Sequence, residues 1–218
     1  MLITLLKKEL TLELRRKSVI SGIALYLFSL TFICYLTFSL QQTRINPVTW
    51  SALFWLTILF SVVNSVARSF IGEKKGISIY LYSVASPQNI IIAKILYNTL
   101  LSLILSFAGY LLFTLFLGEP VKDHFTFTCT LLLTSLGFSS SLSLISGIAS
   151  RANNSNILMT ILSFPVVISI LLMAIKITKN VIDGLDPSAS YDDLLNLLAI
   201  NFISVSLAYL LFPYIWRS

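Results

Sequence analysis

The segment GEKKGISIYLYSVASPQNIIIAK, residues 72–94, determines how many times this chain crosses a membrane. Residues 76–93 carry no charge, and this run of eighteen residues approaches the length of a membrane-spanning helix. The segment also contains Pro87, Gln88 and Asn89, which would lie deep in hydrocarbon if it crossed a membrane. Unpaired polar groups are costly there. We therefore predict that this segment lies outside the bilayer and connects two spans.

The composition of the remaining chain is that of a membrane protein. Of its 218 residues, 56% are hydrophobic and 11% are charged, whereas about 25% charged residues are usual in soluble domains. Six long uncharged apolar runs can each span a bilayer. They cover approximately 18–40, 48–67, 95–117, 125–150, 157–175 and 194–215. The sequence therefore predicts an all-α integral membrane protein with six transmembrane helices, which form one transmembrane domain over residues 1–218.

The distribution of charge predicts the orientation of the six spans. Both termini and the connections 68–94 and 151–156 fall on one side, and 176–193 forms a polar loop on the other. The first side carries eleven basic residues: Lys7, Lys8, Arg15, Arg16, Lys17, Arg68, Lys74, Lys75, Lys94, Arg151 and Arg217. The other side carries four: Arg44, Lys122, Lys176 and Lys179. Because basic residues concentrate on the cytoplasmic side, both termini are expected in the cytoplasm. The net charge of +6 thus records orientation and not nucleic-acid binding.

The first 17 residues predict an amphipathic helix. Leu2, Leu6, Leu10 and Leu14 recur every four residues and share one face, while charged side chains occupy much of the rest. Such a helix lies in the membrane interface with its apolar face toward the lipid. The alternative is a cytoplasmic tail whose charges only set the orientation.

Within the connection 68–94, the periodicity predicts a second amphipathic helix over residues 74–85. Its apolar stripe comprises Ile77, Tyr80, Leu81 and Val84, and its other face holds Lys75, Ser78 and Tyr82 with Ile79 and Ser83 nearby. The helix should end at Ser86 and Pro87, because the residue before proline avoids the helical region. We interpret one face as packed against the bundle and the other as offered to the cytosol. An inert interfacial loop is the alternative.

The fourth apolar run is unusually rich in serine, threonine and glycine. Small residues such as Gly137, Ser140 and Gly147 let helix backbones approach closely, so we interpret this run as a helix-packing surface. A polar wall of a substrate path is the alternative. In the fifth run, Pro165 removes a backbone hydrogen bond and is a candidate kink.

No catalytic chemistry is evident in the sequence. The six apolar runs contain no Asp, Glu, Lys, Arg or His, which argues against a charged transport relay or an intramembrane metalloprotease. The one histidine, His124, follows Asp123 in a turn. We interpret it as an interfacial residue, with a haem ligand completed by a partner as the alternative. Neither a metal site nor a disulfide is expected.

Three segments together resemble the CcmB family, whose members are haem-exporter subunits of cytochrome c maturation and permeases of the ABC-2 type. They are LLKKELTLELRRK (5–17), EKKGISIYLYSVASPQNIIIAKILYN (73–98) and TLLLTSLGFSSSLSLISGIASRANNSNILMTILSFPVVISILL (130–172). The first is similar to the family's leucine-rich opening. The second is similar to its segment from an acidic residue through glycine to Ser-Pro and lysine. The third is similar to its fourth and fifth spans.

The resemblance implies a transporter subunit and not an enzyme. The sequence lacks a Walker A pattern, so ATP and Mg²⁺ would bind a separate CcmA-like ATPase. The other implied partners are CcmC-like and CcmD-like membrane subunits and the haem chaperone CcmE, with two copies of this chain per complex in the bacterial inner membrane. Haem would be handled by the complex, and no cofactor is assigned to this chain. The implied ATPase-coupling residues are Glu73, Lys74, Lys75, Gly76, Ser78, Ile79, Tyr82, Ser83 and Pro87.

Two other functions stay open from the sequence alone. One is an ABC-2 permease that exports a lipid, a glycan or a drug. The other is a membrane scaffold without transport activity. The three functions differ in whether an ATPase depends on this chain and in whether its loss stops cytochrome c maturation.

Overall fold

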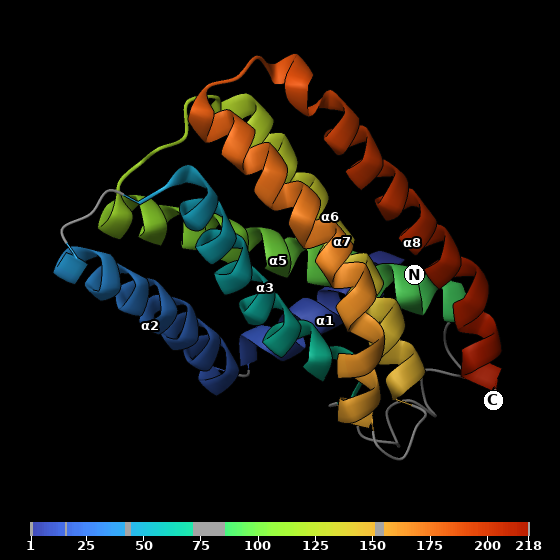
Figure 1. Cartoon of the computed structure of the whole chain (residues 1–218). Coiled ribbons are helices and arrows are strands. Elements are labelled where there is room, and N and C mark those ends of the chain that lie inside the picture. The colour runs from blue at the N-terminus through green and yellow to red at the C-terminus, as the bar shows by residue number, and fades with distance from the viewer. Residues whose placement is uncertain (1, 16, 42–44, 72–85, 151–154, 218) are drawn as a thin grey trace.

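The helices of this computed structural model run back and forth between the two ends of one bundle (Figure 1). Residues 2–15, 17–41, 45–71, 86–150 and 155–217 are described. The elements are α1 (Leu2–Arg15), α2 (Lys17–Gln41), α3 (Pro47–Ile71), α5 (Pro87–Leu117), α6 (His124–Ala149), α7 (Ser155–Asp183), the short 3₁₀ helix η1 (Pro187–Ser190) and α8 (Tyr191–Arg217).

Six of these helices, all except α1 and η1, are long and apolar enough to cross a membrane. No strand occurs among the described residues. The prediction of an all-α fold with six membrane-spanning helices is therefore confirmed, and the protein is a multi-pass membrane protein.

The two ends of the bundle differ in character (Figure 1). At one end, here named the α1 end, α1 packs across the bundle. Both termini lie at this end, together with the helix ends that flank residues 72–85 and 151–154. At the other, named the η1 end, lie the 118–123 connection and η1. The end of α3 and the start of α5, which flank residues 72–85, therefore both lie at the α1 end.

Helix α6 is the central helix of the bundle. It contacts α3, α5, α7 and α8, and 78% of its most apolar 18-residue stretch is buried, compared with 17% of the corresponding stretch of α2. Its buried positions are dominated by small hydroxyl residues, which let four neighbours approach it.

Hydrogen bonds between side chains and neighbouring helices fix α6 in place. On the α5 side, Asn98 Nδ2 donates to Ser143 Oγ at 2.8 Å. On the α8 side, Asn201 Nδ2 donates to the carbonyl of Leu133 at 2.8 Å, and the Ser141 and Ser204 hydroxyls pair at 3.1 Å. Such bonds contribute about 0.6 kcal/mol each in a membrane, so together they favour one register.

Gly137 of α6 lies close to residues of α7 and α8, and we expect that Gly137→Ala destabilises the bundle. An added Cβ would lie 2.6 Å from Asn201 Oδ1 and 3.2 Å from Ile170 Cδ1, so these two side chains, on α8 and α7, must move aside. Overpacking of this kind costs about 1–3 kcal/mol. Gly22→Ala is the matched control, because nothing lies within 4 Å of its added Cβ. Denaturant unfolding of the purified protein measures both, and equal stability of the two variants would contradict close packing at Gly137.

Two helices extend beyond the apolar runs seen in the sequence. Helix α5 begins at Pro87 and not near residue 95, and α7 continues to Asp183 through what we expected to be a polar loop. The loop between α7 and α8 is accordingly short, because η1 and α8 follow almost at once. The connection between α3 and α5 shortens likewise, since α3 reaches Ile71.

Candidate functional site

The site of interest is the first part of α5, residues 87–95, here named the α5 base. Ser86 has an extended backbone (φ −68°, ψ 143°) and Pro87 occupies the first helical turn. Proline suits this position because its missing N–H would be unpaired there and its φ is already helical. Ser86 and Pro87, where we expected a preceding helix to end, therefore mark the start of α5. The predicted helix over residues 74–85 lies outside the described part of the chain.

The α5 base is packed against three other helices. Ile90, Ile91 and Ile95 form a buried cluster with Leu144 of α6 and with two residues of α8. Those two are Ala208 and Phe212. Leu5 of α1 packs against the same cluster. Because packed interiors transmit displacement instead of absorbing it, movement of the α5 base must also move α1, α6 and α8.

A buried ion pair joins the α5 base to α1. Lys94 Nζ lies 3.7 Å from Glu9 Oε1, and the Lys94 side chain is only 1% exposed. Lys8 Nζ lies 3.2 Å from the same oxygen. Burial of a lysine is costly unless a counter-charge accompanies it, so Glu9 holds α1 against α5 at one fixed position.

The four leucines assigned to the membrane interface lie on α1, and three of their side chains are described. Leu2, Leu6 and Leu10 are half-buried, and Leu10 lines a cavity with α2 and α5. The face that carries Leu5 and Glu9 packs against the bundle. Leu14 belongs to the same helix, but its side chain is not among those described. Helix α1 is therefore partly a packing helix.

From the α5 base, a line of polar residues follows α5 toward the η1 end. Lys94, Asn98, Ser102, Ser106 and Tyr110 recur every four residues, and the first four are buried. Two further contacts with α6 are hydroxyl pairs, Ser106 with Ser135 at 3.2 Å and Thr99 with Ser139. The line ends where Tyr110 Oη donates to Glu119 Oε1 at 2.6 Å. Polar contacts thus connect α5 with α6 along most of the bundle.

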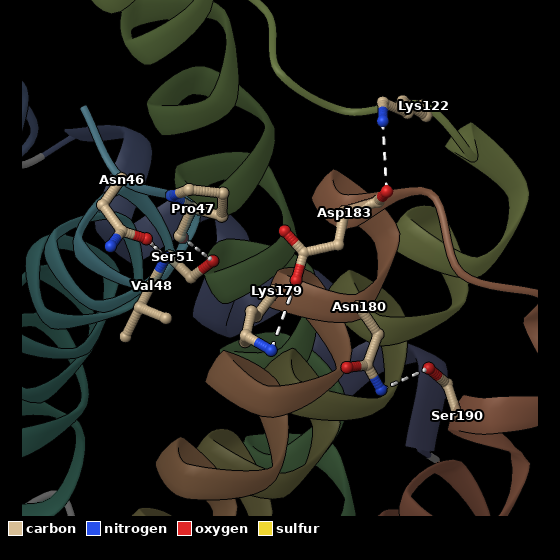
Figure 2. A network of polar contacts seen from close by, with 9 residues as sticks. All are labelled: Asn46, Pro47, Val48, Ser51, Lys122, Lys179, Asn180, Asp183 and Ser190. Carbon is tan, nitrogen blue, oxygen red and sulfur yellow. Dashed lines mark hydrogen bonds and ion pairs between the residues drawn. The ribbon is translucent and has the colours of Figure 1, made fainter. Parts of the chain in front are cut away.

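Polar contacts also close the η1 end (Figure 2). Lys122 Nζ donates to the Asp183 carbonyl at 3.1 Å, and Lys179 pairs with the Asp183 carboxylate at 3.2 Å. Asn180 Nδ2 donates to Ser190 Oγ at 3.2 Å, which ties η1 to α7. These contacts explain why α7 continues to Asp183: its lysines and asparagine have partners there.

Asp123 caps α6, and we expect the stability that it contributes to depend on pH. Its carboxylate accepts hydrogen bonds from the Thr126 side chain and from the amides of Thr126 and Phe125, which hold its pKa below the ordinary value. The folded pKa is lower than the unfolded one, so the contribution is present above the unfolded pKa. It is lost as the pH falls through the folded value.

The measurement compares Asp123→Ala with the unaltered protein by thermal unfolding across this pH range. We expect the variant to lose about 1 kcal/mol at neutral pH and nothing once the carboxyl group is protonated. A difference that stays constant down to the lowest pH would contradict a role for the carboxylate.

Most of the residues implied to couple to an ATPase fall outside the described part of the chain. They are Glu73, Lys74, Lys75, Gly76, Ser78, Ile79, Tyr82 and Ser83. Pro87 is described and starts the α5 base. Among the residues assigned to packing, Gly137, Ser140 and Gly147 are buried in α6, and Pro165 is exposed inside α7.

His124 lies at the η1 end, where its side chain is 65% exposed and its Nδ1 lies 3.7 Å from Glu119 Oε1. Within the described ranges, no group of three or more His, Cys, Asp or Glu side chains could hold a metal ion. Sequence reasoning did not identify the Lys94–Glu9 pair. The sequence contains one indication that Lys94 is buried. Lys94, Asn98 and Ser102 recur every four residues, so the charge of Lys94 lies on a polar face of the helix.

Comparison with known proteins gives one clear result. Residues 1–214 match the family described as CcmB protein. No curated protein sequence matches the chain. The family match covers nearly every residue and agrees with the six membrane-spanning helices. The chain therefore belongs to the CcmB family and is, as that family implies, the permease subunit of a haem-exporting ABC transporter for cytochrome c maturation.

Proposed function

We propose that this chain converts ATP binding and hydrolysis by a CcmA-like ATPase into movement that releases haem-loaded CcmE. The ATPase would act at the α1 end, which is then the cytoplasmic side of a bacterial inner membrane and holds both termini. Two copies of this chain would assemble with two ATPase subunits and with CcmC-like and CcmD-like membrane subunits. Nucleotide and Mg²⁺ belong to the ATPase in this proposal.

The observation that supports the proposal best is the packing of the α5 base. Residues 72–85 enter α5 with only Ser86 between them and Pro87. The α5 base is joined to α1 by Lys94 and Glu9, and to α6 and α8 by the isoleucine cluster. A push on 72–85 would therefore move a block of four helices and not a single loop.

The polar line on α5 extends this mechanism to the opposite end. Hydrogen bonds through Asn98 and Ser106 tie α5 to α6, and α6 starts at His124, after its cap Asp123, at the η1 end. A displacement at the α1 end would thus reach the 118–123 connection, which we place on the outer surface where CcmE binds. Haem need not pass through this chain for the mechanism to operate.

Purification of the native complex tests this assignment. We expect the chain to co-purify with an ATPase subunit and with haem-handling membrane subunits, and the ATPase rate to depend on its presence. An ATPase that is indifferent to this chain would favour a scaffold. Partners without any haem-handling subunit would favour export of a lipid, a glycan or a drug.

A further inference from the structure

A narrow apolar groove runs along the outside of the bundle between α2 and α5, and α1 closes one end. Its volume is about 560 Å³. Its lining includes Leu10 of α1, Ile23, Ala24 and Leu27 of α2, and residues of α5 from Tyr97 to Leu112. Since α2 and α5 both span the membrane, the groove opens toward lipid and not toward water.

The dimensions of the groove select the kind of molecule that fits it. From Tyr97 to Leu112, α5 rises about 22 Å, and the groove beside it has a volume of about 560 Å³. A helix about 10 Å across and 22 Å long occupies roughly 1,700 Å³, which is more than the groove holds. An extended hydrocarbon chain, about 4–5 Å wide by carbon contact distances, fits well. The groove also covers much of a hydrocarbon core about 30 Å thick.

Basic residues near the end of the groove that α1 closes indicate which lipid headgroup would bind there. Lys7 is exposed and precedes Leu10 by three residues. Residues three apart are neighbours on a helix surface, so Lys7 lies next to the part of α1 that lines the groove. The chain from Lys7 into α2 carries three further basic residues, Arg15, Arg16 and Lys17, besides Lys8, which pairs with Glu9. Clusters of four or more basic residues on an amphipathic helix beside a span bind anionic lipids.

We propose that the groove holds one acyl chain of an anionic phospholipid, whose phosphate group lies against α1 near Lys7. The bound lipid fills the space between α1, α2 and α5 and so supports α1 next to the Lys94–Glu9 pair. This site is independent of the proposed coupling to an ATPase, and its test requires no nucleotide.

The test is lipid retention by the purified full-length protein. The protein is reconstituted into bilayers with equal amounts of phosphatidylglycerol and phosphatidylcholine of identical acyl chains, extracted in mild detergent and examined by native mass spectrometry. We expect one retained lipid per chain and a preference for phosphatidylglycerol. Ala24→Phe fills the groove and should abolish retention. Ala199→Phe, at an exposed position on α8, is the matched control and should retain the lipid.

Two further results distinguish the parts of the proposal. Lys7→Gln should reduce the preference for phosphatidylglycerol about fivefold and leave retention of a lipid intact. Retention unchanged in Ala24→Phe would overturn the site. A change from dimer to monomer in Ala24→Phe without loss of lipid would also overturn the site, because the groove would then be occupied by a second copy of the chain.

Discussion

Lys94→Glu is expected to release α1 from the bundle and to abolish the function of the protein. The substitution replaces the buried ammonium group with a carboxylate next to Glu9, where the wild-type groups lie 3.7 Å apart. Breaking a buried ion pair by altering one partner costs about 3–5 kcal/mol. The measurement is the free energy of unfolding of the purified protein in detergent, together with the amount of mature c-type cytochrome in cells.

The double reversal Glu9→Lys with Lys94→Glu separates the ion pair from simple loss of a lysine. It restores opposite charges and should recover at least half of the lost stability. Lys179→Glu is the control, since Lys179 and Asp183 form an exposed pair and exposed pairs contribute about 0–1 kcal/mol. If Lys94→Glu is no less stable than Lys179→Glu, the pair does not hold α1 in place.

Ile79→Glu and Ser83→Glu are expected to uncouple the ATPase from this chain. Both positions lie in the proposed contact segment, where an unpaired charge at a protein interface costs about 3 kcal/mol, or roughly a hundredfold in the binding equilibrium. The protein should still insert, because the six spanning helices are unchanged. Haem-loaded CcmE should accumulate while mature c-type cytochromes fall to the level of a strain without this chain.

Glutamine at the same positions provides the matched control. Ile79→Gln and Ser83→Gln resemble the glutamate variants in shape but carry no charge, so they should retain most of the activity. The measurement is ATPase rate and CcmE release by the purified complex. Normal coupling in both glutamate variants would mean that another part of the chain contacts the ATPase.

The spanning helices could be predicted because apolar length is a strong local signal. Their ends could not be predicted as well. Gln88 and Asn89 look like loop residues, yet they follow Pro87 in the first turn of α5, where polar side chains are tolerated. Lys176 and Lys179 also resemble loop residues, but each has an acidic partner, Asp193 and Asp183 respectively.

The ion pair at the α5 base could not be predicted because its partners lie far apart in the sequence. Glu9 and Lys94 meet only after α1 folds back across α5. Each residue alone suggests a solvated charge beside a membrane, and we used Lys94 only to predict orientation. Tertiary packing buries Lys94. Because burial of an unpaired charge is costly, a counter-charge is required next to it, and Glu9 supplies that charge.

The leucine pattern of α1 predicted an amphipathic helix but not how its faces are used. Leu2, Leu6 and Leu10 form the expected stripe, and each is half-buried. Leu5 lies outside that stripe and packs against the isoleucine cluster. A four-residue repeat drifts around a helix of 3.6 residues per turn, so periodicity alone does not determine which side faces protein.

A role for this chain in cytochrome c maturation, as the permease subunit of an ATP-driven complex, can be tested in cells. The measurement is the content of mature c-type cytochromes, detected by haem staining, in a strain lacking this chain. We predict that mature cytochromes disappear, that CcmE retains its haem, and that the wild-type chain restores maturation while Lys94→Glu does not. Normal cytochrome c maturation in the deletion strain would contradict this role.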